Sequence, residues 1–365
     1  MLPAARYIPL PTFERVLDLA RSGATVVSSA DWPSDVAGLQ DLESRRARFR
    51  DAIADLTFGP AGADGIREAA IGRGRILRGD DLARLLGRAG IRRERLVDHG
   101  LQFARRVDSV GRVYFLSNPG TQAIDGWIPL DRTAPAIQLF DPMTGRNGAA
   151  QVRDAADGRE VYLQIPAGGS LLVAEANAPA RERFESYRTA GEALPIAGPW
   201  TLRFIKGGPT LPASRSIAQL RSWTTFGEDA ATFSGTASYA ATFARPSSGK
   251  GPWRLDLGQV RDSARVHLNG RELATVIGPP YQIVLDDRQV HAKNVLTVSV
   301  SNLAANRIRD LDRRGVAWKK FYNVNFPARL PENRGPDGLF TAAGWDPLDS
   351  GLLGPVTLTP LSAIR

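Results

Sequence analysis

The sequence predicts a multidomain protein of the α/β plus all-β class, with a small α/β domain followed by two antiparallel β-sandwich domains. Three observations lead to this fold class. The chain has 365 residues, and a single core stops growing at roughly 250–300 residues, so two or three domains are expected. Helical and strand patterns alternate over residues 1–100. Short apolar strands separated by turn residues fill most of the remainder.

The first predicted domain, residues 1–100, alternates helices with strands. Residues 13–20 carry apolar side chains at helical spacing, with Thr12 placed to cap that helix and Gly23 to end it. The elements expected after it are a strand at 24–28, a helix at 39–58, a turn at 72–75 leading into a strand near 76–77, and a helix at 82–89. This alternation favours a parallel sheet.

The second predicted domain, residues 101–176, is an antiparallel sandwich. Its expected strands are short and apolar and are separated by turn residues; they lie at 113–116, 136–140, 161–165 and 170–173. Residues 177–196 are largely polar and charged and are expected to form a linker.

The third predicted domain, residues 197–365, is again all β. Its clearest strands are expected at 253–258, 264–269 and 294–300. Asn269 and Gly270 form a two-residue hairpin signal. In the strand before this hairpin the apolar side chains share one face, so His267 points the other way and is predicted to be a surface residue, not a metal ligand.

The composition excludes several kinds of site. Cysteine is absent, which removes disulfides, thiolate nucleophiles and zinc–cysteine sites together. The three histidines, His99, His267 and His291, are scattered and favour neither a metal centre nor a Ser-His-Asp triad. No cofactor and no metal are therefore predicted. No run of about 18 apolar residues exists, so no membrane-spanning helix is expected.

The net charge of +9 has two interpretations. It can reflect a basic surface for nucleic acid or a membrane. It can also reflect a preference for arginine, because only five lysines occur and clusters such as residues 45–50 fit the solvated face of a helix. We favour the second interpretation and expect neither nucleic acid nor a membrane as a partner.

The amino terminus lacks the 7–15-residue apolar core of a secretion signal, because Pro3 and Arg6 interrupt the first six residues and Tyr7, Ile8 and Pro9 follow directly. Either the chain stays in the cytoplasm, or Met1 is not the natural start of a longer exported chain.

An ordered series of motifs in the third domain resembles the sugar-binding β-sandwich domain of glycoside hydrolase family 2. The motifs are Gly198-Pro199-Trp200 and residues 233–243, 255–270 and 294–302. The resemblance implies a jelly-roll, galactose-binding-like fold. The chain departs from the family at Val284-Leu285-Asp286-Asp287, where the family has Asp-Ile-Thr.

The carboxyl-terminal segment narrows the resemblance to glycoside hydrolase family 106, the inverting α-L-rhamnosidases. The motifs that carry it are residues 339–340, 345–348 and 350–356, together with 11–33, 112–118, 141–145 and 165–173. The match covers nearly the whole chain but only the carboxyl-terminal third of that bacterial family, whose parent enzymes are typically exported to the periplasm. The family carries its two catalytic glutamates and its calcium site on an amino-terminal (β/α)8 barrel, and no position here matches them.

The resemblance therefore assigns no catalytic residue and no metal ligand, and it implies that this chain alone is inactive, as a truncated, split or dissected part of a glycosidase. An inverting glycosidase needs two carboxyls about 6.5–9.5 Å apart. The carboxylates that could supply them are Glu228 with Asp229, Asp286 with Asp287, Asp310 with Asp312, and the group Glu332, Asp337, Asp346 and Asp349. For each set a structural role is the favoured interpretation.

Residues 318–345 hold the densest mixture of aromatic and polar side chains. Aromatic faces stack on sugar rings, and arginine, amide and carboxylate groups bind hydroxyls, so this segment is the candidate carbohydrate-binding site. The candidate residues are Trp318, Tyr322, Asn323, Arg334, Asp337 and Trp345. Trp127 and Trp223 are secondary candidates. The alternative is that Phe321, Phe326 and Trp345 only fill the sandwich core.

These observations together predict the carboxyl-terminal, carbohydrate-associated portion of an α-L-rhamnosidase-like glycoside hydrolase, which braces and walls a catalytic barrel. Its expected partners are a rhamnose-containing glycan or glycoside and a catalytic barrel that can be a separate chain. Two alternatives are kept: a free-standing lectin-like carbohydrate-binding module and a basic nucleic-acid-binding protein. Steep salt dependence of DNA binding would favour the last.

Overall fold

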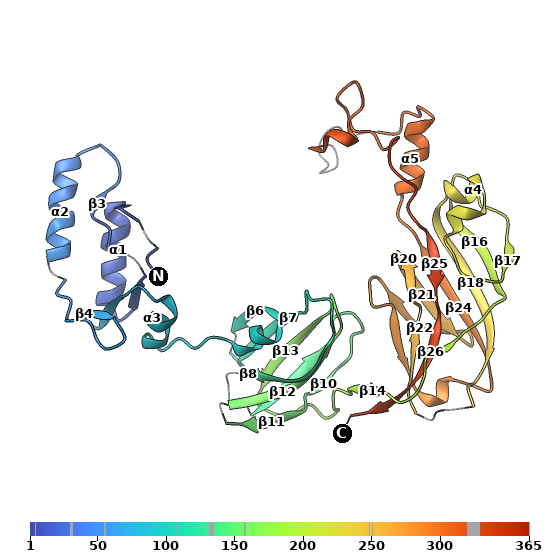
Figure 1. Cartoon of the computed structure of the whole chain (residues 1–365), viewed down its shortest axis with the longest axis horizontal. Coiled ribbons are helices and arrows are strands. Elements are labelled where there is room, and N and C mark those ends of the chain that lie inside the picture. Colours follow the sequence, from blue (N-terminus) through green and yellow to red (C-terminus); the bar gives the residue numbers. More distant parts are fainter. Residues whose placement is uncertain are drawn as a thin grey trace. The chain divides into compact units, whose positions relative to one another are not determined.

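The computed structural model describes residues 1–365 except 4, 30–31, 55, 108, 131–134, 157, 248, 250, 320–328 and 365. The chain forms two compact units, Met1–Glu94 and Arg95–Arg365, which Figure 1 colours from blue to red along the sequence. The predicted fold class is confirmed, because an α/β unit is followed by antiparallel sheets. The predicted boundaries near residues 101, 177 and 197 stay predictions.

The first unit is a small α/β structure. Its elements are β1 (Tyr7–Ile8), α1 (Leu10–Arg21), β2 (Thr25–Ser28), β3 (Asp35–Val36), α2 (Leu42–Ala54), β4 (Arg67–Ile71), β5 (Gly74–Arg78) and α3 (Leu82–Arg88). β2 runs parallel to β5, and β4 runs antiparallel to it, so the sheet is mixed and not purely parallel. The sequence pattern missed β4, which forms a tight hairpin with β5 through the predicted turn at 72–75.

The predicted helix at 13–20 is present, but Thr12 does not cap it. α1 begins at Leu10 with Pro9 as its N-cap residue and Pro11 in its first turn, a position where the missing N–H of proline costs nothing. The predicted apolar stripe is buried at Phe13, Leu17 and Ala20, and the ring of Phe13 lies 4.7 Å from that of Phe49 of α2.

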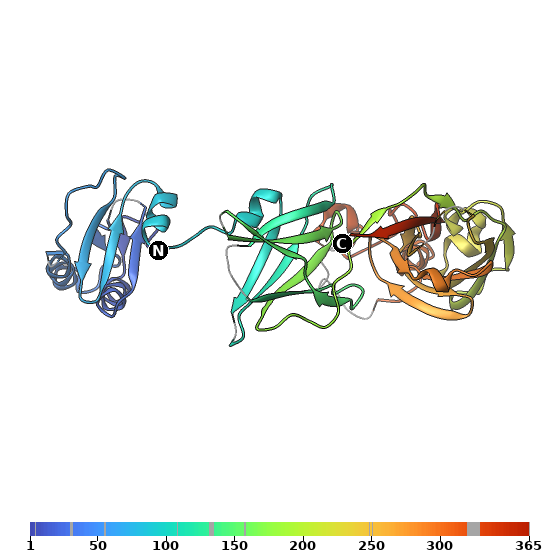
Figure 2. The ribbon, with the colours of Figure 1, turned by 90° about the horizontal axis from the view of Figure 1, so that it is seen from below.

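The portion that follows, residues 95–176, is called here the middle sandwich. Its elements are η1 (Arg95–His99), β6 (Gln102–Val107), β7 (Arg112–Ser117), β8 (Ile124–Leu130), β9 (Ala136–Phe140), β10 (Asn147–Ala149), β11 (Val152–Ala155), β12 (Gly158–Ile165) and β13 (Ser170–Ala176). The strands form a five-stranded sheet, β10-β9-β13-β7-β6, and a three-stranded sheet, β11-β12-β8. Figure 2 shows these strands from below. Their apolar side chains share one buried cluster.

The rest of the chain is called here the carboxyl-terminal sandwich. Its strands are β14 (Tyr187–Thr189), β15 (Leu194–Pro195), β16 (Trp200–Gly208), β17 (Arg215–Ile217), β18 (Ser234–Ala244), β19 (Trp253–Asp256), β20 (Gln259–Arg261), β21 (Ser263–Leu268), β22 (Arg271–Val276), β23 (Gln282–Leu285), β24 (Lys293–Ser301), β25 (Gly351–Gly354) and β26 (Thr357–Ala363). Its helices are η2 (Trp223–Phe226), α4 (Glu228–Ala231), η3 (Asp287–Gln289), α5 (Ala305–Arg313) and η5 (Pro331–Asn333).

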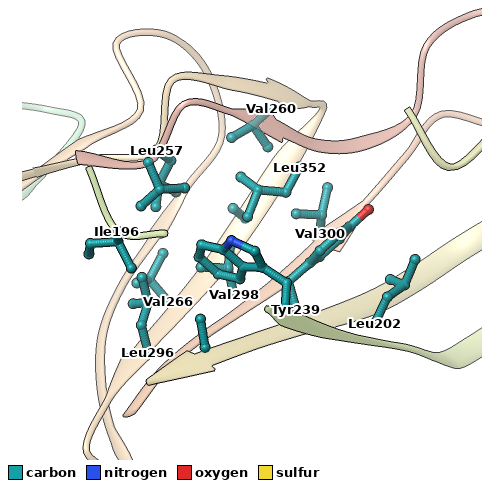
Figure 3. Packing of buried hydrophobic residues seen from close by; sticks show 14 of the residues in the cluster. Ile196, Leu202, Tyr239, Leu257, Val260, Val266, Leu296, Val298, Val300 and Leu352 are labelled. Carbon is teal, nitrogen blue, oxygen red and sulfur yellow. The ribbon is translucent and has the colours of Figure 1, made fainter. Parts of the chain in front are cut away.

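The largest sheet of this sandwich has the order β17-β16-β18-β24-β21-β22, and the sheet facing it is built on β14-β26-β19-β23 with β15 also paired to β26. Figure 3 shows Val266 and Val298 of the six-stranded sheet in one core with Leu257, Val260 and Leu352. The period-two alternation predicted this arrangement. As expected, His267 lies on the opposite side from this core, with Nε2 3.7 Å from Oε2 of Glu272.

Residues 177–196, expected to be a polar linker, also carry structure. Phe184 is only 8% exposed and belongs to the apolar cluster of the middle sandwich. Further along, β14 and β15 both pair with β26. One apolar side chain in a charged stretch is a weak sequence signal, which is why the pattern did not indicate these contacts. Among the described residues, no helix has the length and apolar character needed to cross a membrane.

Candidate functional site

The candidate site lies in the segment between β24 and β25, and α5 forms its base. Figure 1 shows α5 and the chain beyond it in orange and red. The sequence pattern did not predict α5, because its nine residues carry mainly charged side chains. The charges stabilise the helix locally: Asp310 pairs with Arg307 and with Arg314 at 2.8 Å each.

A buried amide ties the two ends of this segment together. The Asn306 side chain donates from Nδ2 to the carbonyl of Leu348 at 2.7 Å and accepts from its N–H at 2.8 Å. The neighbouring Ser350 N–H donates to Oγ of Ser222 at 3.0 Å, and Nδ2 of Asn302 donates to Oγ of Ser350 at 3.0 Å. Because the amides of Asn302 and Asn306 and the hydroxyl of Ser350 all have partners, the base of the site is fixed to the sandwich.

Asp312, at the end of α5, organises the loop above this base. Its carboxylate is 5% exposed and lies 3.2 Å from Nζ of Lys319. It accepts a hydrogen bond from Nε1 of Trp318 at 2.6 Å and another from the N–H of Ala342 at 2.8 Å. The carboxylate therefore joins two parts of the segment that are separated by about two dozen residues along the chain. With three donors around it, this buried carboxylate holds the loop together.

Aromatic rings and one ammonium group continue from Asp312 across the site. Nζ of Lys319 donates to the carbonyl of Phe340 and lies 5.9 Å from the Trp318 ring and 5.7 Å from the Phe340 ring. The Phe340 and Trp345 rings meet edge to face at 5.7 Å. Trp345 donates from Nε1 to Oδ1 of Asn333 at 2.7 Å. The site therefore contains a series of neighbouring aromatic rings, and the indole N–H groups of its two tryptophans already donate hydrogen bonds to protein side chains.

The remaining candidates occupy different positions. Arg334 is exposed, and its backbone forms an antiparallel bridge with Phe340. Asp337 is exposed too, and it accepts from the N–H of Leu339 at 3.0 Å within a tight turn. Tyr322 and Asn323 lie outside the described residues, as do Phe321 and Phe326. The structure thus brings Trp318, Trp345 and Arg334 together around Lys319 and Phe340. The sequence pattern had not selected Lys319 or Phe340 as site residues, although both lie in the same segment as the chosen tryptophans.

The two secondary candidates, Trp127 and Trp223, differ in how far their rings are exposed to solvent. Trp223 is fully buried and packs edge to face against Phe204 and Phe233, so the expectation that it contacts a sugar is wrong. Trp127 is part-exposed on β8, where its ring lies 5.4 Å from that of Tyr162. Burial, together with a hydrogen bond to Asp125, raises the pKa of Tyr162 to about 12. Arg153 covers part of the Trp127 ring at 4.6 Å.

The acidic pairs considered as catalysts have structural positions. Glu228 and Asp229 lie in the first turn of α4 and not in a loop. Carboxylates in the first turn of a helix interact favourably with the helix dipole. Asp286 caps η3. Asp287 accepts at one oxygen from Nε1 of Trp253 at 3.1 Å, from Arg245 at 2.5 Å and from the Gly251 N–H at 3.2 Å. The indole hydrogen bond, followed by the contacts from Gly251 and Arg245, lowers the pKa of Asp287.

Comparison with known proteins places the fold. No family model matches the chain. A solved rhamnosidase from Novosphingobium sp. PP1Y matches 97% of this chain with a TM-score of 0.68 and 24% identity. A curated protein of Formosa agariphila, named putative β-glucuronidase, is 30% identical over 193 residues, or 48% of this chain. The chain spans 32% of the rhamnosidase and 16% of the Formosa protein. The chain therefore has the fold of one third of a rhamnosidase.

Proposed function

We propose that this chain is the carboxyl-terminal, carbohydrate-associated portion of a family 106 α-L-rhamnosidase-like glycoside hydrolase, and that it braces and walls a catalytic barrel. The observation that carries the proposal is the match to a rhamnosidase over 97% of this chain. The 30% identity to a putative β-glucuronidase over 193 residues supports the broader class of glycosidases. A shared fold does not determine activity, so the proposed function also has to agree with the chemistry of the site.

The site supports contact with a sugar through ring faces and one arginine. Asp312 holds the Trp318 indole N–H, and Asn333 holds that of Trp345, so both tryptophans have fixed positions and lose little side-chain entropy when a ligand binds. Arg334 is exposed beside Phe340, and its guanidinium can donate to hydroxyls. In this proposal Trp318, Trp345, Arg334 and Asp337 form the wall of the sugar cleft, with Tyr322 and Asn323 as further candidates.

The test is an NMR titration of the purified, isotope-labelled chain with L-rhamnose and with p-nitrophenyl α-L-rhamnoside. We expect weak binding whose shifts include the indole signals of Trp318 and Trp345. Arg334→Ala should weaken the binding severalfold without lowering the melting temperature, because the side chain is exposed. Trp127→Ala is the matched control, since it removes a part-exposed tryptophan elsewhere.

Two outcomes would count against this site. Shifts that persist unchanged in Arg334→Ala, and that move instead in Trp127→Ala, would place sugar contact on the middle sandwich. Tight binding to DNA that falls steeply with salt, with no response to either sugar, would favour the nucleic-acid alternative.

A further inference from the structure

In the candidate site a cationic side chain and an aromatic ring stand side by side on one face of a short hairpin. The backbones of Arg334 and Phe340 form an antiparallel bridge. Residues directly opposite each other in such a pair have their β-carbons about 4.5–5.5 Å apart on the same side. Arg334 is exposed and Phe340 is part-exposed. A ligand on this face therefore meets a guanidinium and a ring together.

The rings near this hairpin present carbon surface. Phe340 meets Trp345 edge to face, with 5.7 Å between the ring centroids, and Trp345 and Trp318 are both part-exposed. Nε1 of Trp345 donates to Oδ1 of Asn333 at 2.7 Å. Nε1 of Trp318 donates to Oδ1 of Asp312 at 2.6 Å. Both indole N–H groups are thus used within the protein, so what the rings offer a ligand is their carbon surface.

The ammonium group of Lys319 lies near these rings and is mostly engaged. Its Nζ is 3.2 Å from Oδ1 of Asp312 and donates to the carbonyl of Phe340. Two of its three hydrogens therefore have partners. One hydrogen remains, so a ligand hydroxyl that reached Lys319 would bind there more tightly than an apolar group.

We propose that this face distinguishes a deoxy sugar from its hydroxylated counterpart, with Arg334 binding ring hydroxyls and the Phe340 and Trp345 rings contacting the methyl group. The inference rests on the proposed function, since it concerns the same sugar site. A methyl group placed on the rings leaves water without giving up a hydrogen bond. A hydroxymethyl group in the same place would give up hydrogen bonds to water, and the carbon surface of the two rings offers no replacement.

The two kinds of group on this face match the two parts of such a sugar. L-Rhamnose carries its hydroxyls along one edge of the pyranose ring and a methyl group at one corner. Arg334 and Phe340 stand next to each other, so one sugar can place its hydroxyl edge on the guanidinium and its methyl corner on the ring. Asn333 already holds the Trp345 indole, so little side-chain entropy is lost when the methyl group binds.

The test is an NMR titration of the isotope-labelled chain with three sugars that differ only in the group on one ring carbon. L-Rhamnose has a methyl group there, L-lyxose has a hydrogen, and L-mannose has a hydroxymethyl group. The signals followed are the indole N–H groups of Trp318 and Trp345. We expect L-rhamnose to bind tighter than either other sugar by about threefold or more, a modest ratio because one methyl or hydroxyl on an apolar surface discriminates weakly.

Variants separate the two parts of the face. Phe340→Ala should remove the difference between L-rhamnose and L-mannose, whereas Arg334→Ala should weaken all three sugars and keep their order. Phe103→Ala is the matched control, because Phe103 of β6 is a phenylalanine 37% exposed on another sheet, and it should change neither the affinities nor the order. Melting curves show which variants stay folded. If Phe340→Ala unfolds the segment, Phe340→Leu keeps an apolar side chain there and should keep the preference for L-rhamnose over L-mannose.

Equal affinities for the three sugars would overturn this inference and leave the proposed sugar contact standing. Tightest binding of L-mannose would also overturn it, because a hydroxyl would then have found a partner such as the Lys319 ammonium. A preference for L-rhamnose over L-mannose that survives unchanged in Phe340→Ala would place the methyl group elsewhere and overturn it as well. If no sugar moves the indole signals, the inference fails together with the proposed sugar contact.

Discussion

Single residues decide how the candidate site is built, and Asp312 is the clearest case. The sequence pattern indicated that Trp318 and Trp345 belong to one segment, but it paired Asp312 with Asp310 as acids. In the structure only Asp312 turns inward to meet Trp318, Lys319 and Ala342. The partners are fixed by the path of the loop, and no spacing in the sequence specifies that path. The sequence pattern therefore indicated the segment and its tryptophans, but not Lys319 or Phe340 and not the hydrogen bonds that hold the tryptophans in place.

Asp312→Asn should loosen the loop without unfolding the sandwich. The amide keeps one acceptor but loses the charge that pairs with Lys319 and turns a donor toward groups that already donate. We expect the variant to lose about 1–3 kcal/mol of stability and the Trp318 indole N–H to exchange faster with solvent. Both are measured by thermal melting and hydrogen exchange. Glu332→Gln, at an exposed position of the same segment, is the control and should change neither.

Asp287 makes a pH-dependent contribution to the carboxyl-terminal sandwich. Its folded-state pKa is lowered from the reference value of 3.8, first by the Trp253 hydrogen bond. A lowered folded-state pKa contributes stability above the unfolded-state pKa, and that stability is lost as the pH falls through the folded-state value. We therefore expect Asp287→Asn to melt below the wild type at neutral pH and the gap to close below pH 3.8. A gap that stays constant down to acid pH would contradict this linkage.

At the scale of elements, the strands with the clearest alternation were predicted, strands such as β4 and β8 were not, and α5 was missed for one physical reason. Strands such as β21 and β24 have one face in the core, so apolar and polar residues alternate along their sequence. The α5 helix buries only Asn306, a polar residue. Its stability comes from the pairs around Asp310 and from hydrogen bonds to a loop some forty residues away. Helix patterns that depend on apolar periodicity cannot find such an element.

Asn306→Ala tests whether that amide positions the segment. The change leaves the carbonyl and the N–H of Leu348, in a part-buried place, without their side-chain partner. We expect a loss of about 1–3 kcal/mol for the two hydrogen bonds removed. Chemical shifts should move in α5 and residues 345–350 and stay constant in the middle sandwich. A fall in melting temperature with no local shift change would mean that Asn306 acts only through the sandwich core.

At the scale of the whole molecule, three folding units are still predicted, with weak points near residues 100 and 177–196. Residues 177–179 and 190–193 are exposed, whereas Phe184 between them is buried. Limited proteolysis should therefore cut first at these two exposed stretches or near residue 100, where few contacts protect the backbone. Mass spectrometry of the early fragments locates the cuts. Early cleavage within residues 253–302 would contradict the division, since the strands of that range contribute to the main core.

The last prediction concerns activity, and it follows from how the acidic residues are used. An inverting glycosidase needs one carboxylic acid and one carboxylate about 6.5–9.5 Å apart, both facing the bound sugar. The carboxylates near the candidate site hold the protein together instead: Asp310 pairs with two arginines, Asp312 with Lys319, and Asp337 with a turn N–H. Their oxygens therefore already serve as partners of protein cations and N–H groups.

The purified chain should therefore leave p-nitrophenyl α-L-rhamnoside intact under conditions in which a complete rhamnosidase hydrolyses it, even where the sugar titration shows binding. Release of p-nitrophenol by the chain would contradict this only if Asp312→Asn, Asp337→Asn or Glu332→Gln abolished it, because a contaminating enzyme would be indifferent to these changes. Binding without turnover is the combination that a cleft wall predicts. A lectin-like module would also bind the sugar without hydrolysing it. The two functions differ in how the affinity for the sugar responds to a catalytic barrel. A lectin-like module keeps its affinity when no barrel is present, whereas a cleft wall should bind the sugar more tightly once the barrel is supplied.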